Sequence, residues 1–246
     1  MKTKFLHIAT ALLFAGFTSS CSDFLDRYPL DELSDSSFWK TENDAMMAVT
    51  DIYGCLPTWD QDEDINSDNA VHGIKWAAGN ISKGIYDPMD QSWAGSYTPI
   101  RQCNLVLEKV KDIEMSDESR KKIEGQAYFF RAFVYFNLIR SFGDVPYIDK
   151  PLNLTDVEDI TRTPREEVYA KVMADFDKAI EYLPEEWDAA NTPRVTKGAA
   201  LAMKARAALY YNNWQVAADA SKAVMDLGKY ELYDAGNTGK YQELFW

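Results

Sequence analysis

The residues from Asp117 to Phe142 constrain the fold more than any other part of the chain. Apolar side chains recur there at spacings of three and four residues, which predicts one long helix. An apolar arc that includes two adjacent stripes is too wide for a surface helix, so we expect neighbouring helices to cover both sides of it. The two stripes consist of Ile123, Ala127, Phe130, Val134 and Leu138, and of Phe129, Phe133 and Phe136.

Start and stop signals predict further helices on both sides of this one. Residues 41–44, Thr-Glu-Asn-Asp, have the spacing of a capping box and open a helix that ends near Tyr53. Residues 163–166, Thr-Pro-Arg-Glu, place threonine at the N-cap, proline at N1 and glutamate at N3 of a helix that ends at Leu183. The other predicted helices are 97–110, 196–211 and 214–227, the last two joined by a turn at Asn212 and Asn213.

Two segments of the chain resemble each other, which predicts an irregular tetratricopeptide-like helical repeat array. The segment GQAYFFRAFVYFNLIRSFG at 125–143 is similar to GAALAMKARAALYYNNWQ at 198–215, at an offset of 73 residues. Trp214 and the alanines after it have the spacing that such repeats use at their helix contacts. We therefore expect an all-α fold with Trp214 packed between helices; an unrelated helical bundle is the alternative.

Residues 54–96 interrupt the helical pattern with a long insertion that is rich in Trp, Asp and Gly. A long irregular segment inside a compact domain is usually functional or disordered, and its aromatic residues favour the first reading. A pyranose stacks its apolar face on an aromatic ring, while polar side chains bind its hydroxyls. The packing of these aromatic residues onto the helices is the alternative. The candidate ligand-binding residues are Trp59, Trp76, Asn80, Tyr86 and Trp93.

The first residues have the pattern of a secretory signal. Two lysines precede thirteen mostly apolar residues, Phe5–Phe17, and this run is shorter than the span of about 20 residues that crosses a bilayer. Residues 18–20 lead directly to Cys21, as in a bacterial lipobox. We predict that 1–20 is a lipoprotein signal peptide and that Cys21 becomes the lipidated first residue; an ordinary signal peptide with an incidental cysteine is the alternative. Each buried CH₂ of an acyl chain contributes about 0.8 kcal/mol of membrane affinity.

The strongly negative net charge of the chain excludes some classes of binding partner. The formal net charge is −13, and it becomes −15 when Lys2 and Lys4 leave with the signal peptide. Such acidity argues against nucleic-acid binding and against attraction to anionic lipid head groups, so the membrane anchor must be covalent. After Cys21, the chain contains Cys55 and Cys103, and the sequence leaves open whether they form a disulfide or two buried thiols.

The chain shows no motif of a common catalytic centre, and with 39 carboxylates a glycosidase pair cannot be recognised from spacing alone. His72 is the only histidine outside the predicted signal peptide, and no HExxH, paired CxxC or Gly-rich phosphate loop occurs. We therefore predict that the protein is not an enzyme and needs no cofactor.

An acidic stretch has oxygen ligands at alternate positions, as Ca²⁺ prefers. Ile65 and Val71 stand where an EF-hand has its glycine and its bidentate glutamate, so a solvated acidic loop is the favoured interpretation and a Ca²⁺ site the alternative. The stretch contains Asp60, Asp62, Asp64, Asn66 and Asp68.

Several motifs occur in the order of the SusD/RagB family, which the chain resembles over residues 21–246. They are CSDFLDRYP, SFWKTENDAMMAVTDIYGCL, SWAGSYTPIRQCNLVLEKV, GQAYFFRAFVYFNLIRSFGDVPYI, TRTPREEVYAKVMADFDKAIEYLP and RVTKGAALAMKARAALYYNNWQVAADASKAVMDLGKYEL. The run from Gly125 to Pro146 is the most specific of them. Gln126 stands where the family most often has glutamate, so an ion pair that used this carboxylate would be lost.

The resemblance implies an outer-membrane lipoprotein that faces the cell exterior of a Bacteroidetes-type bacterium. It also implies binding of oligosaccharides and their delivery to a TonB-dependent, SusC-like transporter. Asp23 and Asp26 resemble the family's surface-export signal. RagB-like capture of peptides is one alternative, and a helical-repeat adaptor that holds a protein partner is another. Members of the family usually have a further C-terminal half, so we expect this chain to be a truncated form.

Overall fold

The computed structural model describes residues 38–56, 84, 93–157 and 159–231. The chain divides into Met1–Phe38 and Trp39–Trp246, and every described residue except Phe38 belongs to the second unit. Regular secondary structure in these residues is helical, apart from an isolated antiparallel bridge between Val145 and Thr163. The predicted all-α class is confirmed. No helix in the described ranges is long and apolar enough to cross a membrane.

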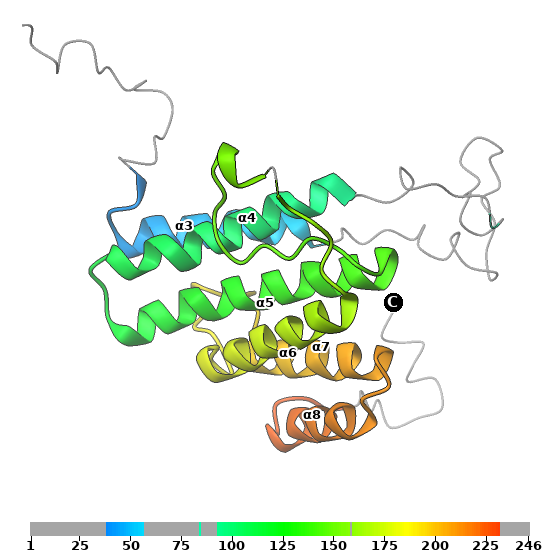
Figure 1. Ribbon diagram of the computed structural model, residues 1–246. Helices are drawn as coiled ribbons and strands as arrows, with labels where there is room; N and C mark the ends of the chain where they lie inside the picture. Colours follow the sequence, from blue (N-terminus) through cyan, green and yellow to red (C-terminus); the bar gives the residue numbers. More distant parts are fainter. Residues whose placement is uncertain (1–37, 57–83, 85–92, 158, 232–246) are drawn as a thin grey trace, which may run out of the picture. The chain divides into compact units, whose positions relative to one another are not determined.

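The helices of the second unit pack mainly on their neighbours in the sequence, α3 on α4, α4 on α5, and so on to α8 (Figure 1). Contacts that join mainly successive helices are typical of repeat arrays. The elements are α3 (Glu42–Ile52), the 3₁₀ turn η2 (Tyr53–Cys55), α4 (Trp93–Lys109), η6 (Val110–Asp112), α5 (Asp117–Phe142), η7 (Leu154–Val157), α6 (Arg165–Tyr182), α7 (Lys197–Tyr210) and α8 (Trp214–Asp226).

Helix α5 is the centre of the core and has the predicted bounds. It packs against α3 and α4 and also against α6, so its wide apolar arc is covered as expected. Seven of the eight side chains of its two predicted stripes are buried, and Phe133 is half-buried. The helix begins after Ser116, whose Oγ accepts from Ser119 N at 3.0 Å, and ends at Gly143, whose φ of 69° suits a residue without a Cβ.

The predicted capping box at the start of α3 is confirmed. Thr41 N donates to Asp44 Oδ2 at 2.7 Å, and Asp44 N donates to Thr41 Oγ1 at 3.3 Å. Thr196 caps α7 with one hydrogen bond of this kind, since its Oγ1 accepts from Ala199 N at 3.3 Å. In both helices the partners of the cap lie within one turn of the chain, so the cap forms without a long-range contact.

The prediction that Thr163 is the N-cap of α6 was wrong, because Pro164 occupies that position. Thr163 does not bind the first turn; its backbone pairs with Val145, with N···O distances of 2.9 and 3.2 Å. Arg165 N instead donates to Asp144 Oδ1 at 3.0 Å, so a residue 21 positions away satisfies the helix N-terminus. The long-range bridge therefore overrides the local signal, because it satisfies both backbone groups of Thr163.

Helix α4 begins at Trp93, four residues before the predicted start, and includes Pro99. Gly95 and Pro99 weaken the helical pattern of the sequence. Pro99 and Ile100 are buried against the core, and this tertiary packing outweighs the low helix propensity.

The expected packing of Trp214 between helices was wrong. Its side chain is 61% exposed at the first position of α8. Ala217 and Ala220 are the residues of α8 that are buried, so the close approach of α7 and α8 depends on alanine rather than on tryptophan.

The two cysteines of the described residues are free thiols, Cys55 half-buried and Cys103 fully buried. Burial raises the pKa of Cys55 to about 11 and also raises the pKa of Cys103. At neutral pH both sulfurs are therefore protonated, which makes them weak nucleophiles.

Candidate ligand-binding cleft

A cleft of about 680 Å³ is lined by residues of α3, η2, α4, α5 and α7. This volume lies in the range of about 300–1,000 Å³ that is common for small-molecule sites. Its apolar lining comes mainly from α5, where Val134 and Phe136 are buried and Phe133 is half-buried.

The polar lining of the cleft contains amides and charged groups. Asp51, Gln102 and Asn137 lie on three different helices, and Gln102 Nε2 donates to the carboxylate of Asp51. Asn137 Nδ2 donates to Phe133 O at 3.1 Å within α5. Arg140 and Arg206 are exposed and complete the set of charged lining residues. Amides and guanidinium groups beside apolar surface are a combination that suits a polyhydroxylated ligand.

The cleft lies where the chain enters and leaves the segment that carries the predicted ligand-binding residues. Cys55 lines one side of the cleft, and Leu56 follows it at the end of η2. Gly95 lines another side, in the first turn of α4, which begins at Trp93. The scaffold thus fixes both attachment points of residues 57–92 beside a ligand-sized cavity.

Trp59, Trp76, Asn80 and Tyr86 lie outside the described residues, and the interpretation of these four stays a prediction. Trp93 is described and half-buried, but it does not line the cleft. Its ring meets Phe142 edge-on at a centroid distance of 4.9 Å, and the Arg162 guanidinium lies 5.2 Å from its centre.

The acidic stretch Asp60–Asp68 also lies outside the described residues, so neither of its interpretations is tested. Among the residues that the structure describes, no group of three His, Cys, Asp or Glu side chains is placed to hold a metal ion.

A buried polar network joins α4 and α5, which line the cleft, to α6. Arg131 on α5 binds both carboxylate oxygens of Asp175 on α6 at 2.7 Å, and its Nη1 donates to Asn104 Oδ1 on α4 at 2.8 Å. The side chains of Arg131 and Asp175 are each 8% exposed. Burial raises the pKa of Asp175, and the hydrogen bonds from Arg131 oppose this change. The bidentate geometry satisfies both charges, as a buried ion pair requires.

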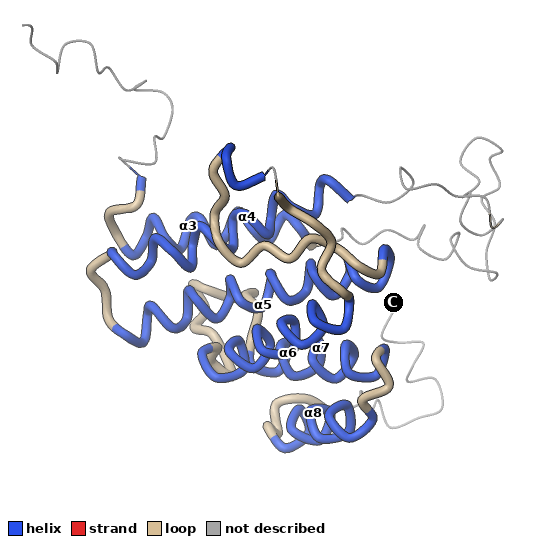
Figure 2. Tube along the Cα trace, in the orientation of Figure 1, coloured by secondary structure: helices blue, strands red, loops and turns tan. Residues whose placement is uncertain are grey.

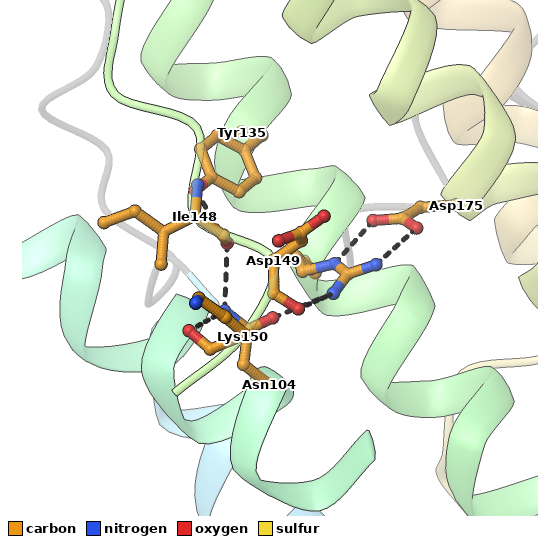
Figure 3. Close-up of polar contacts among 7 residues, drawn as sticks. Asn104, Tyr135, Ile148, Asp149, Lys150 and Asp175 are labelled. Carbon is orange, nitrogen blue, oxygen red and sulfur yellow. Dashed lines mark hydrogen bonds and ion pairs between the residues drawn. The ribbon is translucent and has the colours of Figure 1, made fainter. Parts of the chain in front are cut away.

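The same network holds the connection between α5 and α6 (Figure 3), which runs back along α4 and α5 (Figure 2). Asn104 Nδ2 donates to Ile148 O at 2.9 Å. Tyr135 donates to Ile148 O at 3.1 Å and accepts from Ile148 N at 2.6 Å. Arg131 also reaches Asp149 O at 3.4 Å. One cluster of side chains therefore fixes α4, α5, α6 and this connection relative to one another.

Gln126 forms a second buried junction. Its Oε1 accepts from Tyr53 Oη at 2.8 Å and from Arg194 Nη1 at 3.1 Å, while its Nε2 donates to Lys122 O at 3.0 Å. Arg194 also donates to Thr50 Oγ1 at 3.0 Å. The contact with Arg194 therefore persists as a hydrogen bond to a neutral amide, where a glutamate would have made an ion pair.

The helices form tetratricopeptide-like pairs, and a ligand-sized cleft lies beside them. These features are typical of a helical-repeat scaffold. The chain belongs to the SusD-like family, which is described as starch-binding and associating with the outer membrane and whose profile matches residues 24–209. It is a family of carbohydrate-binding proteins rather than of enzymes, in agreement with the prediction that the chain is not an enzyme.

Individual relatives agree with this assignment. SusD-like protein P2 of Formosa agariphila is 29% identical over 240 residues, which make up 92% of this chain and 46% of that protein. The crystal structure of a SusD-like protein from Bacteroides fragilis matches with a TM-score of 0.76 and 27% identity, over 89% of this chain and 44% of that one. A second B. fragilis structure, of a SusD-like carbohydrate-binding protein, matches with a TM-score of 0.67 and 26% identity, over 78% and 42% of the two chains. The chain thus spans about half the length of the curated relatives it matches.

Proposed function

We propose that this chain is part of a lipid-anchored surface protein that binds oligosaccharide nutrients and delivers them to a TonB-dependent, SusC-like transporter in the outer membrane. The match of residues 24–209 to a starch-binding, outer-membrane-associated family carries the proposal. The description of a solved relative as carbohydrate-binding supports it. The ligand-sized cleft, with its amides, guanidinium groups and aromatic surface, supplies chemistry that fits a sugar.

The proposed ligand contacts are Trp59, Trp76, Asn80, Tyr86 and Trp93, together with the polar lining of the cleft. The position of the cleft beside Leu56 and Trp93 supports this grouping, because loops carried by a rigid scaffold commonly supply binding residues. We propose no catalytic residue and no cofactor.

Replacing Trp76 with alanine is expected to weaken oligosaccharide binding about tenfold, because a stacking surface is lost. Isothermal titration against a panel of neutral and acidic oligosaccharides measures the effect. The melting temperature should stay constant for this variant. It should fall for Trp93→Ala, which removes the contacts with Phe142 and Arg162.

Trp214→Ala is the matched control, because Trp214 is exposed on α8 and α8 does not line the cleft. The control should bind like the parent protein. Parent-like binding by Trp76→Ala would contradict the contact assignment. Failure of the parent to bind any glycan, together with binding of peptides, would favour the RagB-like alternative.

Replacing Cys21 with serine is expected to move the protein from the detergent phase to the aqueous phase of a Triton X-114 extract. The reason is that two or more acyl chains give stable anchoring, whereas the mature chain is acidic and has little attraction to anionic lipids. Mass spectrometry of the N-terminal peptide tests the proposed removal of residues 1–20 directly. An unmodified Cys21 in the parent protein would overturn the proposed tether.

A further inference from the structure

Among the described residues, two cations line the cleft without a partner, whereas two other cations on the same helices are paired. On α5, Arg131 is paired with Asp175, and on α7, Lys204 is paired with Asp177. Within the described part of the chain, Arg140 has neither an ion pair nor a hydrogen bond, and the same holds for Arg206. A chain with 39 acidic and 26 basic residues thus leaves two guanidinium groups available in one cavity.

The charge of the cleft is opposite in sign to that of the chain. Its charged lining residues are Arg140, Arg206 and Asp51, and Asp51 is already bound by Gln102. The local net charge is therefore positive, while the chain carries −13. The surrounding acidity repels anions at long range, so an anion would be held by direct contact with these guanidinium groups rather than by the overall field.

Guanidinium groups are suited to one class of sugar substituent. The planar fork of arginine binds a carboxylate or a sulfate through two parallel hydrogen bonds. Asn137 and Gln102 lie in the same cavity and can hydrogen-bond hydroxyl groups, while Phe133 offers an aromatic surface. A neutral sugar would use the amides and the ring but would leave both cations without a counter-charge.

We infer that the cleft binds an anionic oligosaccharide, with Arg140 and Arg206 holding its uronate carboxylates or sulfate esters. This inference rests on the proposed oligosaccharide-binding function and narrows its ligand class. It assigns the two arginines as specificity-determining residues, because they distinguish a charged glycan from a neutral one with the same hydroxyl groups.

The test measures binding of the full-length protein to an oligogalacturonate and to the same oligosaccharide after its carboxylates are reduced to alcohols. A sulfated galactan oligosaccharide and its desulfated form test sulfate esters, the other group that could supply the negative charge. The parent should prefer one of the two charged forms over its neutral counterpart, and the preference should weaken as the salt concentration rises. The double variant Arg140→Gln/Arg206→Gln should lose about tenfold in affinity for the charged form and keep its affinity for the neutral one.

Arg101→Gln is the matched control, because Arg101 is exposed on α4 but does not line the cleft. It should leave all affinities unchanged, and the melting temperatures of all variants should match the parent. Equal affinity for charged and neutral forms, or unchanged binding by the double variant, would overturn the inference. Binding of neutral glycans alone would overturn it while the proposed function stands; binding of no glycan at all would overturn both.

Discussion

Replacing Asp175 with alanine is expected to lower the free energy of unfolding by about 3–5 kcal/mol, because it leaves the buried charge of Arg131 without a partner. Both side chains are 8% exposed, so water cannot replace the lost carboxylate without opening the interface of α5 and α6. Urea unfolding followed by circular dichroism at 222 nm measures the change.

Asp177→Ala is the control for this variant. Asp177 lies two residues further along α6 and pairs with Lys204, but its side chain is 60% exposed. Lys204 is 19% exposed, but the carboxylate of this pair is open to solvent, so its loss should cost only about 1 kcal/mol. If both variants lost the same small amount, the pair of Arg131 and Asp175 would be solvated rather than buried.

The double variant Arg131→Met/Asp175→Leu should recover part of the loss, since it removes both charges together. Full recovery is not expected. Asn104 Oδ1 and Asp149 O would each lose the donor that Arg131 supplies, and unsatisfied buried acceptors are costly. The loss of unfolding free energy that remains in the double variant measures how much stability Arg131 contributes through its hydrogen bonds to α4 and to the connection between α5 and α6.

Replacing Phe130 with alanine is expected to cost about 3–5 kcal/mol of stability, through lost burial and the cavity that remains. Phe130 is fully buried at the centre of α5, and its ring meets Tyr53 edge-on at 4.5 Å and Phe129 at 5.3 Å. Tyr53 in turn binds Gln126 and Val195, so the variant also loosens the attachment of η2 to α5.

Urea unfolding compares Phe130→Ala with Met225→Ala, whose side chain is 68% exposed on α8. The control should lie within about 0.5 kcal/mol of the parent, as surface substitutions usually do. A loss below about 1.5 kcal/mol for Phe130→Ala would mean that neighbouring side chains fill the cavity.

The features that were predictable from the sequence are those whose cause is local. The 3.6-residue spacing in α5 and the capping box at Thr41 depend on residues within one or two turns, and both were confirmed. The cap of α6 was not predictable, because Thr163 pairs with Val145 and Asp144 takes its place at the helix N-terminus. The prediction that Trp214 packs between helices failed for a related reason. Repeat spacing does not say which side chains of a helix are covered by its neighbour.

The same distinction holds for the candidate site. Composition and irregular sequence indicated residues 54–96 as the ligand-binding segment. The cleft itself could not be predicted, because residues from several helices that are separated in the sequence line it. Arg131 was not singled out from the sequence, although a charged residue within the aromatic run 128–136 is a usable signal of a buried partner. Asp175 could not be chosen as the partner, because only the packing of α5 on α6 brings it close.

The anchoring of Leu56 and Trp93 has a consequence for how such proteins diversify. Leu56 N bonds to Tyr53 O at the end of η2, and Trp93 packs on Phe142, so contacts with the helices hold both of these residues. Each doubling in length of a connecting stretch adds only about 0.6 kcal/mol of closure entropy. A change in the length of the stretch between Leu56 and Trp93 should therefore cost little stability, and the helices can keep their sequence while this stretch varies.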